Sequence, residues 1–199
     1  MVINIIGDCD KRPVLYTIMK ICQSLGDVLL ITSSSRLVRL SDTGESMGHY
    51  QNTMIGITYD GIDNFWEDFV YDVQDFEYTI IDNIVEAEAD VVIYVEGMVQ
   101  SEQEQENLEY IEDYKTISLY SSAGFTDSKT LRNCEEFEAY RDMCPINPKL
   151  SKEVAKILAP YFKTDASKLE SLANVVTSTH PTSVPSMSAK KKVLPFGKR

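Results

Sequence analysis

The turn after the first predicted strand is the segment of this sequence best placed to bind a phosphate. It follows the apolar residues 2–7 and reads Gly7-Asp8-Cys9-Asp10-Lys11-Arg12-Pro13. A phosphate loop of the GxxxxGK[ST] type needs small residues whose N–H groups converge on the anion, a lysine, and a hydroxyl for magnesium. Gly7 and Lys11 fit that chemistry, but two aspartates repel phosphate and Pro13 supplies neither N–H nor hydroxyl. The turn is therefore in the right place for a phosphate loop and has lost the residues that catalysis needs.

Two other polar residues are expected beside this turn, because each follows an apolar, strand-like run. The carboxyl ends of parallel strands meet at one edge of an open α/β sheet, and ligands bind in the crevice there. The first helix could add its N-terminal dipole to the charges of Lys11 and Arg12. The residues expected to line a nucleotide site, if a nucleotide binds, are Gly7, Lys11, Ser33 and Asp82.

No catalytic residue and no metal site is predicted. The two histidines lie in polar segments, and the sequence has no GxSxG elbow. The four cysteines have no CxxC spacing, which is typical of reduced thiols in a cytosolic protein. Carboxylates are so abundant that no spacing singles out a general acid and a general base.

Strands and helices alternate along the chain. Apolar runs typical of strands occupy residues 2–7, 28–31, 54–59, 76–81, 91–95 and 116–120. Helical spacing of apolar residues occurs over residues 13–25, 62–73, 101–114, 151–162 and 168–176. Ser101 and Glu104 form a capping-box pattern at the third of these helices. Residues 42–52 are polar and predicted to be a loop, and residues 145–148 a rigid turn. The pattern predicts a three-layer α/β fold with a mostly parallel central sheet and helices on both faces.

The charge of the 199-residue chain is unevenly distributed. The net charge is −12, yet the last nineteen residues hold five basic residues and no acid. Residues 1–180 therefore carry fourteen basic residues against thirty-one acidic ones, a net charge of −17. No Lys or Arg lies between Arg39 and Lys115, where twenty Asp and Glu residues occur. Such a body is not expected to bind nucleic acid directly. Its acidic surface is either simply solvated or a docking face for a basic partner.

The composition divides the chain into a domain over residues 1–176 and a tail over residues 177–199. The tail begins with a flexible linker rich in Ser, Thr and Pro and ends in KKKVLPFGKR. It could contact an acidic protein surface, an anionic membrane or a nucleic acid, but it is too short for stable membrane anchoring alone. With no apolar run of eighteen residues and no secretory signal, a cytoplasmic location is expected. The predicted partner-binding residues of the tail are Lys190, Lys191, Lys192, Phe196, Lys198 and Arg199.

Taken in order, the segments VINIIG with its loop and helix, VLLIT, EYTIID, ADVVIYV and PINPKLSKEVAKIL resemble the ParA/MinD-like group of P-loop ATPases. The resemblance covers residues 1–162 and implies a P-loop NTPase-like, Rossmann-like fold. It places Asp82 where the family carries the acid that helps to organise magnesium and water. The lysine-glycine-glycine loop with its GK[ST] ending, the Walker A motif, is absent. The chain thus resembles a degenerate member of the group, without the main support for ATP hydrolysis.

Three functions are compatible with these features. The first is a non-catalytic adaptor or positioning protein that binds protein partners, a second copy included, in a secretion, pilus, phage or plasmid system. It needs no cofactor. The alternative is a nucleotide-binding ATPase or switch with a noncanonical phosphate loop. The third is a nucleic-acid-associated structural protein held by its basic tail.

Overall fold

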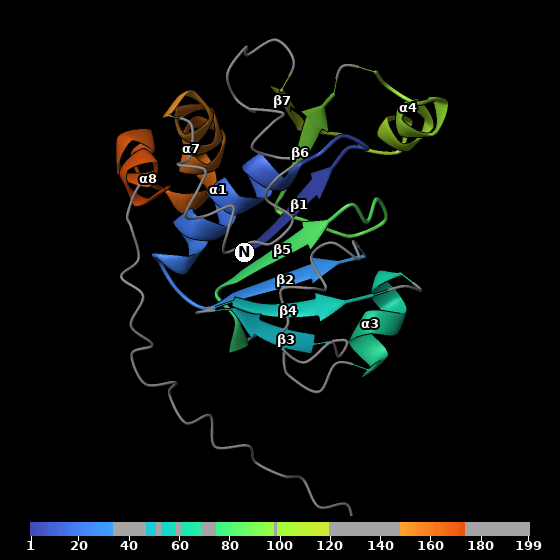
Figure 1. Ribbon diagram of the computed structural model, residues 1–199, viewed down its shortest axis with the longest axis horizontal. Coiled ribbons are helices and arrows are strands. Elements are labelled where there is room, and N and C mark those ends of the chain that lie inside the picture. The colour runs from blue at the N-terminus through green and yellow to red at the C-terminus, as the bar shows by residue number, and fades with distance from the viewer. Residues whose placement is uncertain are drawn as a thin grey trace, which may run out of the picture.

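Seven strands form one sheet, whose central strands are short apolar runs rich in β-branched residues (Figure 1). The computed structural model describes residues 1–33, 47–50, 53–58, 61–68, 75–97, 99–119 and 148–173. The strand order is β3-β4-β2-β5-β1-β6-β7, and every neighbouring pair is parallel except β3 with β4. The strands are β1 (Val2–Ile6), β2 (Val28–Thr32), β3 (Met47–Tyr50), β4 (Thr53–Ile57), β5 (Tyr78–Asp82), β6 (Val91–Glu96) and β7 (Lys115–Ser118).

Helices cover both faces of the sheet. The described helices are α1 (Arg12–Gln23), α3 (Ile62–Asp68), α4 (Glu102–Glu109), α7 (Pro148–Phe162) and α8 (Ala166–Ala173). Helices α1, α7 and α8 pack against one another on one side (Figure 1). On the other face, Ile62 and Phe65 of α3 join a second apolar cluster with Leu29, Ile31 and Ile81. The predicted three-layer α/β fold is confirmed.

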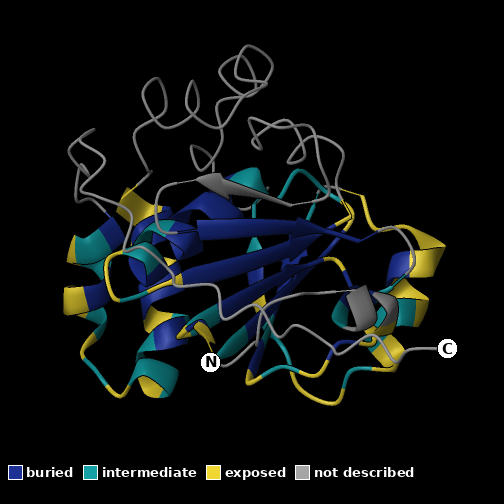
Figure 2. Cartoon of the chain, turned by 90° about the horizontal axis from the view of Figure 1, so that it is seen from below, coloured by how far each residue is buried: buried dark blue, intermediate teal, exposed yellow. Residues whose placement is uncertain are grey.

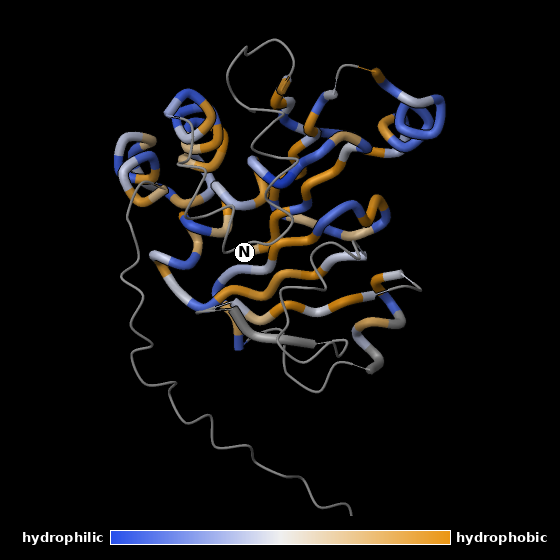
Figure 3. The backbone as a smooth tube through the Cα atoms, in the orientation of Figure 1, coloured by the Kyte–Doolittle hydropathy of each residue, from blue (hydrophilic) through white to orange (hydrophobic). Residues whose placement is uncertain are grey.

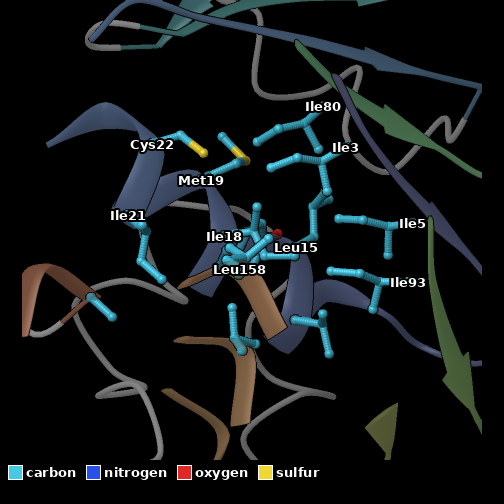
Figure 4. Close-up of a cluster of buried hydrophobic side chains, with 14 of the residues drawn as sticks. Ile3, Ile5, Leu15, Ile18, Met19, Ile21, Cys22, Ile80, Ile93 and Leu158 are labelled. Atoms are coloured by element: carbon cyan, nitrogen blue, oxygen red, sulfur yellow. The ribbon is translucent and has the colours of Figure 1, made fainter. Parts of the chain in front are cut away.

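The larger core lies between α1 and the sheet. Ile3, Ile5 and Ile80 of the strands face Leu15 and Ile18 of α1 (Figure 4). Each of these side chains is at most 1% exposed. The central strands are buried, whereas the exposed residues lie on the helices and loops around them (Figure 2). This packing fixes the start of α1, and hence the turn before it, against the carboxyl edge of the sheet.

The register of the central strands brings the predicted site together. Ile5 of β1 and Thr32 of β2 both lie opposite Asp82 of β5. The residues that follow β1 therefore meet the ends of β2 and β5 at one edge of the sheet, as the sequence predicted.

Some predicted boundaries were wrong. Residues 47–50, predicted to be loop, form β3, because antiparallel pairing with β4 supplies hydrogen bonds that local composition does not signal. Helix α4 ends at Glu109 instead of continuing to residue 114, and the Tyr110 N–H closes a tight turn onto the Asn107 carbonyl. Pro148, expected in a rigid turn, is the first residue of α7, where its fixed φ suits a helix start.

Several predictions lie outside the described residues. They include residues 69–73 and 174–176, predicted to be helical, and the tail with Lys190, Lys191, Lys192, Phe196, Lys198 and Arg199. Within the described ranges, no helix combines the length and apolar character needed to cross a bilayer.

Candidate functional site

The turn between β1 and α1 depends on Gly7. Its φ of +134° lies in the region that only glycine adopts readily. A Cβ atom on Gly7 would also come within 2.4 Å of the Val95 carbonyl oxygen on β6. The glycine that sequence analysis assigned to phosphate binding thus lets β1 and β6 approach each other closely.

The Lys11 side chain folds back onto the protein. Its Nζ donates a hydrogen bond to the Gly7 carbonyl at 2.7 Å and lies 3.3 Å from Asp82 Oδ1. The two charged side chains are only 11% and 8% exposed. Asp82 Oδ1 accepts no hydrogen bond from the described residues, so its contact with the Lys11 ammonium is an ion pair without hydrogen-bond geometry. The lysine that would meet a phosphate is therefore neutralised internally.

The hydroxyl that bonds the Asp82 carboxylate belongs to Thr32 and not to Ser33. The Thr32 hydroxyl donates to Asp82 Oδ2 at 2.8 Å. Ser33 is exposed, whereas Thr32 is fully buried. Of the four predicted lining residues, the structure brings together Gly7, Lys11 and Asp82. Ser33 directly follows β2 and so lies at the same edge of the sheet, but the hydroxyl that bonds Asp82 is that of Thr32, which was not among the predicted residues.

Backbone amides of the turn are occupied by oxygens of the chain itself. The Gly7 N–H donates to Asn83 Oδ1 at 3.1 Å, and the Asp8 N–H donates to Glu104 Oε1 at 3.0 Å. At the helix end of the turn, the Arg12 N–H donates to Asp10 Oδ1 at 3.2 Å. Amides that would converge on an anion in a phosphate loop here meet internal acceptors.

Asn83 and Glu104 were not predicted as site residues. Asn83 adopts φ +62°, a left-handed conformation that asparagine tolerates, directly after Asp82. Glu104 was recognised only as part of a capping box. Ser101 Oγ does accept from the Glu104 N–H at 3.0 Å, as that motif requires. The Glu104 carboxylate, however, reaches the Asp8 amide of the turn, a direction that no local signal in the sequence gives.

Helix α4 is fastened to the turn through this network. Ser101 Oγ donates to Asp8 Oδ2 at 2.7 Å, next to the bond between the Asp8 N–H and Glu104. The Glu104 side chain is buried, with 4% of the residue exposed. Tyr94 of β6 also hydrogen-bonds Glu104, and Gln100 Nε2 donates to the Tyr94 hydroxyl at 3.2 Å. Burial, together with the negative charge of Glu104, raises the pKa of Tyr94.

Cys9 is not an activated nucleophile. Its Sγ donates to the Val95 carbonyl at 3.2 Å. Burial raises the pKa of Cys9 to about 11, an effect that Glu104 reinforces and Lys11 opposes. At neutral pH the side chain is therefore a thiol, and a thiol is a poor nucleophile.

The charge of the site disfavours a metal-nucleotide complex. Four acids lie at the turn or against it: Asp8, Asp10, Asp82 and Glu104. Arg12 forms a bidentate ion pair with Asp10. Among the residues that the structure describes, no group of three or more His, Cys, Asp or Glu side chains is arranged to hold a metal ion. Among the described residues, the charged groups of the turn pair with one another and fix the loop against the sheet.

Comparison with known proteins gives a likeness of layout. No protein-family model matches the sequence, and a search of curated proteins found no match. Among solved structures, the chain is similar to the MinC:MinD cell division protein complex of Aquifex aeolicus, with 15% identity, a TM-score of 0.45, and coverage of 86% of this chain and 93% of that chain. It is also similar to the MinD cell division protein of Aquifex aeolicus, with 16% identity, a TM-score of 0.41, and coverage of 86% and 94%. Both matches are of overall layout, the layout of the ParA/MinD-like group that the sequence resembles.

Proposed function

We propose that this chain is a non-catalytic adaptor or positioning protein with a degenerate ParA/MinD-like scaffold, which binds a protein partner in a larger assembly. The observation that carries the proposal is the internal closure of the turn after β1. Lys11 is held by Gly7 and Asp82, and the Asp8 amide is held by Glu104. The groups that would bind a triphosphate in this fold are instead bonded to other residues of the same chain.

The cost of opening the turn supports this view. A triphosphate would have to break the hydrogen bond from Lys11 to the Gly7 carbonyl, along with the ion pair to Asp82, and displace Glu104 from the Asp8 amide. A hydrogen bond to a charged group is worth about 1.5–3 kcal/mol, so giving up two of them costs about 3–6 kcal/mol. That cost would weaken binding by about 10²- to 10⁴-fold. The acids that remain would repel the incoming phosphates further.

A nucleotide-dependent switch is the second candidate, because Lys11 and Asp82 do lie together at the predicted edge of the sheet. In such a switch the nucleotide would take Lys11 from Asp82 and release α4 from the turn. The two candidates differ in whether nucleotide binds the folded state at all.

Thermal unfolding with and without ATP-Mg or GTP-Mg separates the two functions. An adaptor with a closed turn unfolds at the same temperature in every sample. A switch at 100 times its dissociation constant would gain about 2.7 kcal/mol. For a chain of this size, that gain raises the Tm by about 5–11 °C. A saturable shift that Lys11→Met abolishes would overturn the adaptor proposal.

Affinity capture from the native cell tests the adaptor role itself. The full chain and a chain ending at residue 180 would serve as paired baits. We expect a protein partner to be retained by the full chain. If neither bait retains a protein above an unrelated acidic control, partner binding is contradicted.

A further inference from the structure

Helix α4 is attached to the body in an unusual way. A surface helix normally buries an apolar stripe against the core. The only buried side chain of α4 is the carboxylate of Glu104. Its sequence, EQEQENLE, contains one apolar residue, Leu108, which is only partly buried. Most residues of the helix are hydrophilic (Figure 3). Burial of apolar surface in the core therefore does not explain why this helix lies against the body.

The outward face of α4 is an acidic stripe. Glu102, Glu106 and Glu109 occupy positions i, i+4 and i+7 and are all exposed. Like charges at this spacing destabilise a helix by about 0.2–0.5 kcal/mol per pair, and Glu109 also opposes the negative end of the helix dipole. The nearest basic residues along the sequence are Arg39 and Lys115. The stripe therefore offers several exposed carboxylates with which a basic group could pair.

Two large apolar side chains are exposed in the segments that flank α4 in the sequence. Val99, just before the helix, is 81% exposed, and Tyr110, just after it, is 83% exposed. Leu25 is the other exposed large apolar side chain among the described residues, and it is only 43% exposed. Tyr110 follows Glu106 by four residues and so lies beside the stripe on the helix surface. We call Glu102, Glu106, Glu109, Val99 and Tyr110 the α4 face.

The basic segment of this chain has the complementary pattern. Residues 190–199, KKKVLPFGKR, place three lysines before an apolar centre and Lys198 and Arg199 after it. Lysine and arginine can pair with the stripe, while Val193, Leu194 and Phe196 can cover exposed apolar side chains. We propose that the α4 face binds residues 190–199 of a second copy of this chain. This inference rests on the proposed function, because it names the adaptor's partner.

A second copy is favoured over the chain's own tail by the placement of α8. The tail continues from the end of α8, which lies on the opposite side of the molecule from α4 (Figure 1). A domain of this size is about 40 Å across. The linker that the composition predicts, residues 177–189, would have an r.m.s. span of about 20 Å as a random coil. Pairing between copies needs no stretched linker, and a head-to-tail contact of this kind builds rings or filaments.

Sedimentation velocity of the full chain at several concentrations tests this contact. We expect reversible self-association at about 50 mM salt that is lost at about 500 mM, as the Debye length falls from about 14 Å to about 4 Å. The triple variant E102Q/E106Q/E109Q should raise the dissociation constant by about tenfold or more. The same substitutions relieve repulsion within α4, so the Tm should not fall.

A matched variant and a charge exchange make the test specific. D75N/E86Q/E88Q removes three exposed acids elsewhere and should leave the dissociation constant within about twofold. E102K/E106K/E109K and K190E/K191E/K192E should each abolish association, and their combination should restore it.

Three results would overturn the inference. They are a chain that stays monomeric at low salt, association that the α4 substitutions do not weaken, and equal loss in the matched variant. If the chain stays monomeric and ATP does not change its Tm, the contact through the α4 face is overturned and the adaptor proposal stands. A nucleotide-dependent Tm shift would overturn the adaptor proposal whatever the association state.

Discussion

Replacing Glu104 by alanine tests whether this carboxylate closes the turn after β1. The substitution removes the acceptor of the Asp8 N–H, 3.0 Å away, and the hydrogen-bond partner of Tyr94. Each hydrogen bond to a charged group is worth about 1.5–3 kcal/mol. Water can enter at this edge of the sheet and recover part of that energy. We therefore expect Glu104→Ala to lower the free energy of unfolding by about 2–4 kcal/mol.

Two companion variants show which part of the side chain matters. Glu104→Gln keeps the shape and an acceptor oxygen and loses the charge, so a loss of about 1 kcal/mol is expected. Glu102→Ala makes the same change in helix propensity at an exposed position. It should cost no more than the helix-dipole contribution of its carboxylate, about 0.3–1 kcal/mol.

Urea denaturation at pH 7, followed by circular dichroism, measures these differences. Hydrogen exchange of the α4 amides adds a local readout, since the helix should open more often when its one buried anchor is gone. If Glu104→Ala were no more destabilising than Glu102→Ala, the proposed role of Glu104 in holding the turn would be refuted.

Three further predictions concern the same turn. Lys11→Met should lower the free energy of unfolding by about 3–5 kcal/mol, because it leaves the Asp82 carboxylate buried without its countercharge. Adding Asp82→Asn should recover at least half of that loss in urea denaturation, and a double variant no more stable than the single one would count against the ion pair. Gly7→Ala should cost at least about 2 kcal/mol and lower the Tm more than Gly61→Ala. Both glycines have positive φ, but only at Gly7 would the new Cβ meet a backbone oxygen, so the reverse order would contradict the assignment. Cys9, with its pKa raised to about 11, should be alkylated slowly by iodoacetamide at pH 7.5 and faster as pH rises to 10, whereas a rate plateau below pH 9 by mass spectrometry would contradict its burial.

The strands and the meeting of Lys11 with Asp82 could be predicted because they follow from simple rules. A strand buried on both faces reads as a continuous apolar run, and residues at the carboxyl ends of parallel strands share one edge of the sheet. The hydrogen bond from Thr32 to Asp82 was not predicted, because it depends on the register between β2 and β5, which places Thr32 opposite Asp82.

The closure by Glu104 could not be predicted, because it depends on tertiary packing. The spacing of Ser101 and Glu104 predicts the start of α4, and in the structure Ser101 is its N-cap. Which way the Glu104 carboxylate points depends on α4 lying against the turn, about a hundred residues earlier in the chain. Strand β3 was missed for a similar reason, since its partner β4, rather than its own composition, makes it a strand.

NMR spectroscopy of the ¹⁵N-labelled full chain during titration with ATP-Mg tests the central claim most directly. It observes the Gly7 and Asp8 amides that Asn83 and Glu104 are inferred to occupy. With the turn closed, both amide resonances should stay in place up to millimolar nucleotide. Saturable movement of the two resonances, lost in Lys11→Met, would show that the turn receives a triphosphate and would contradict the account.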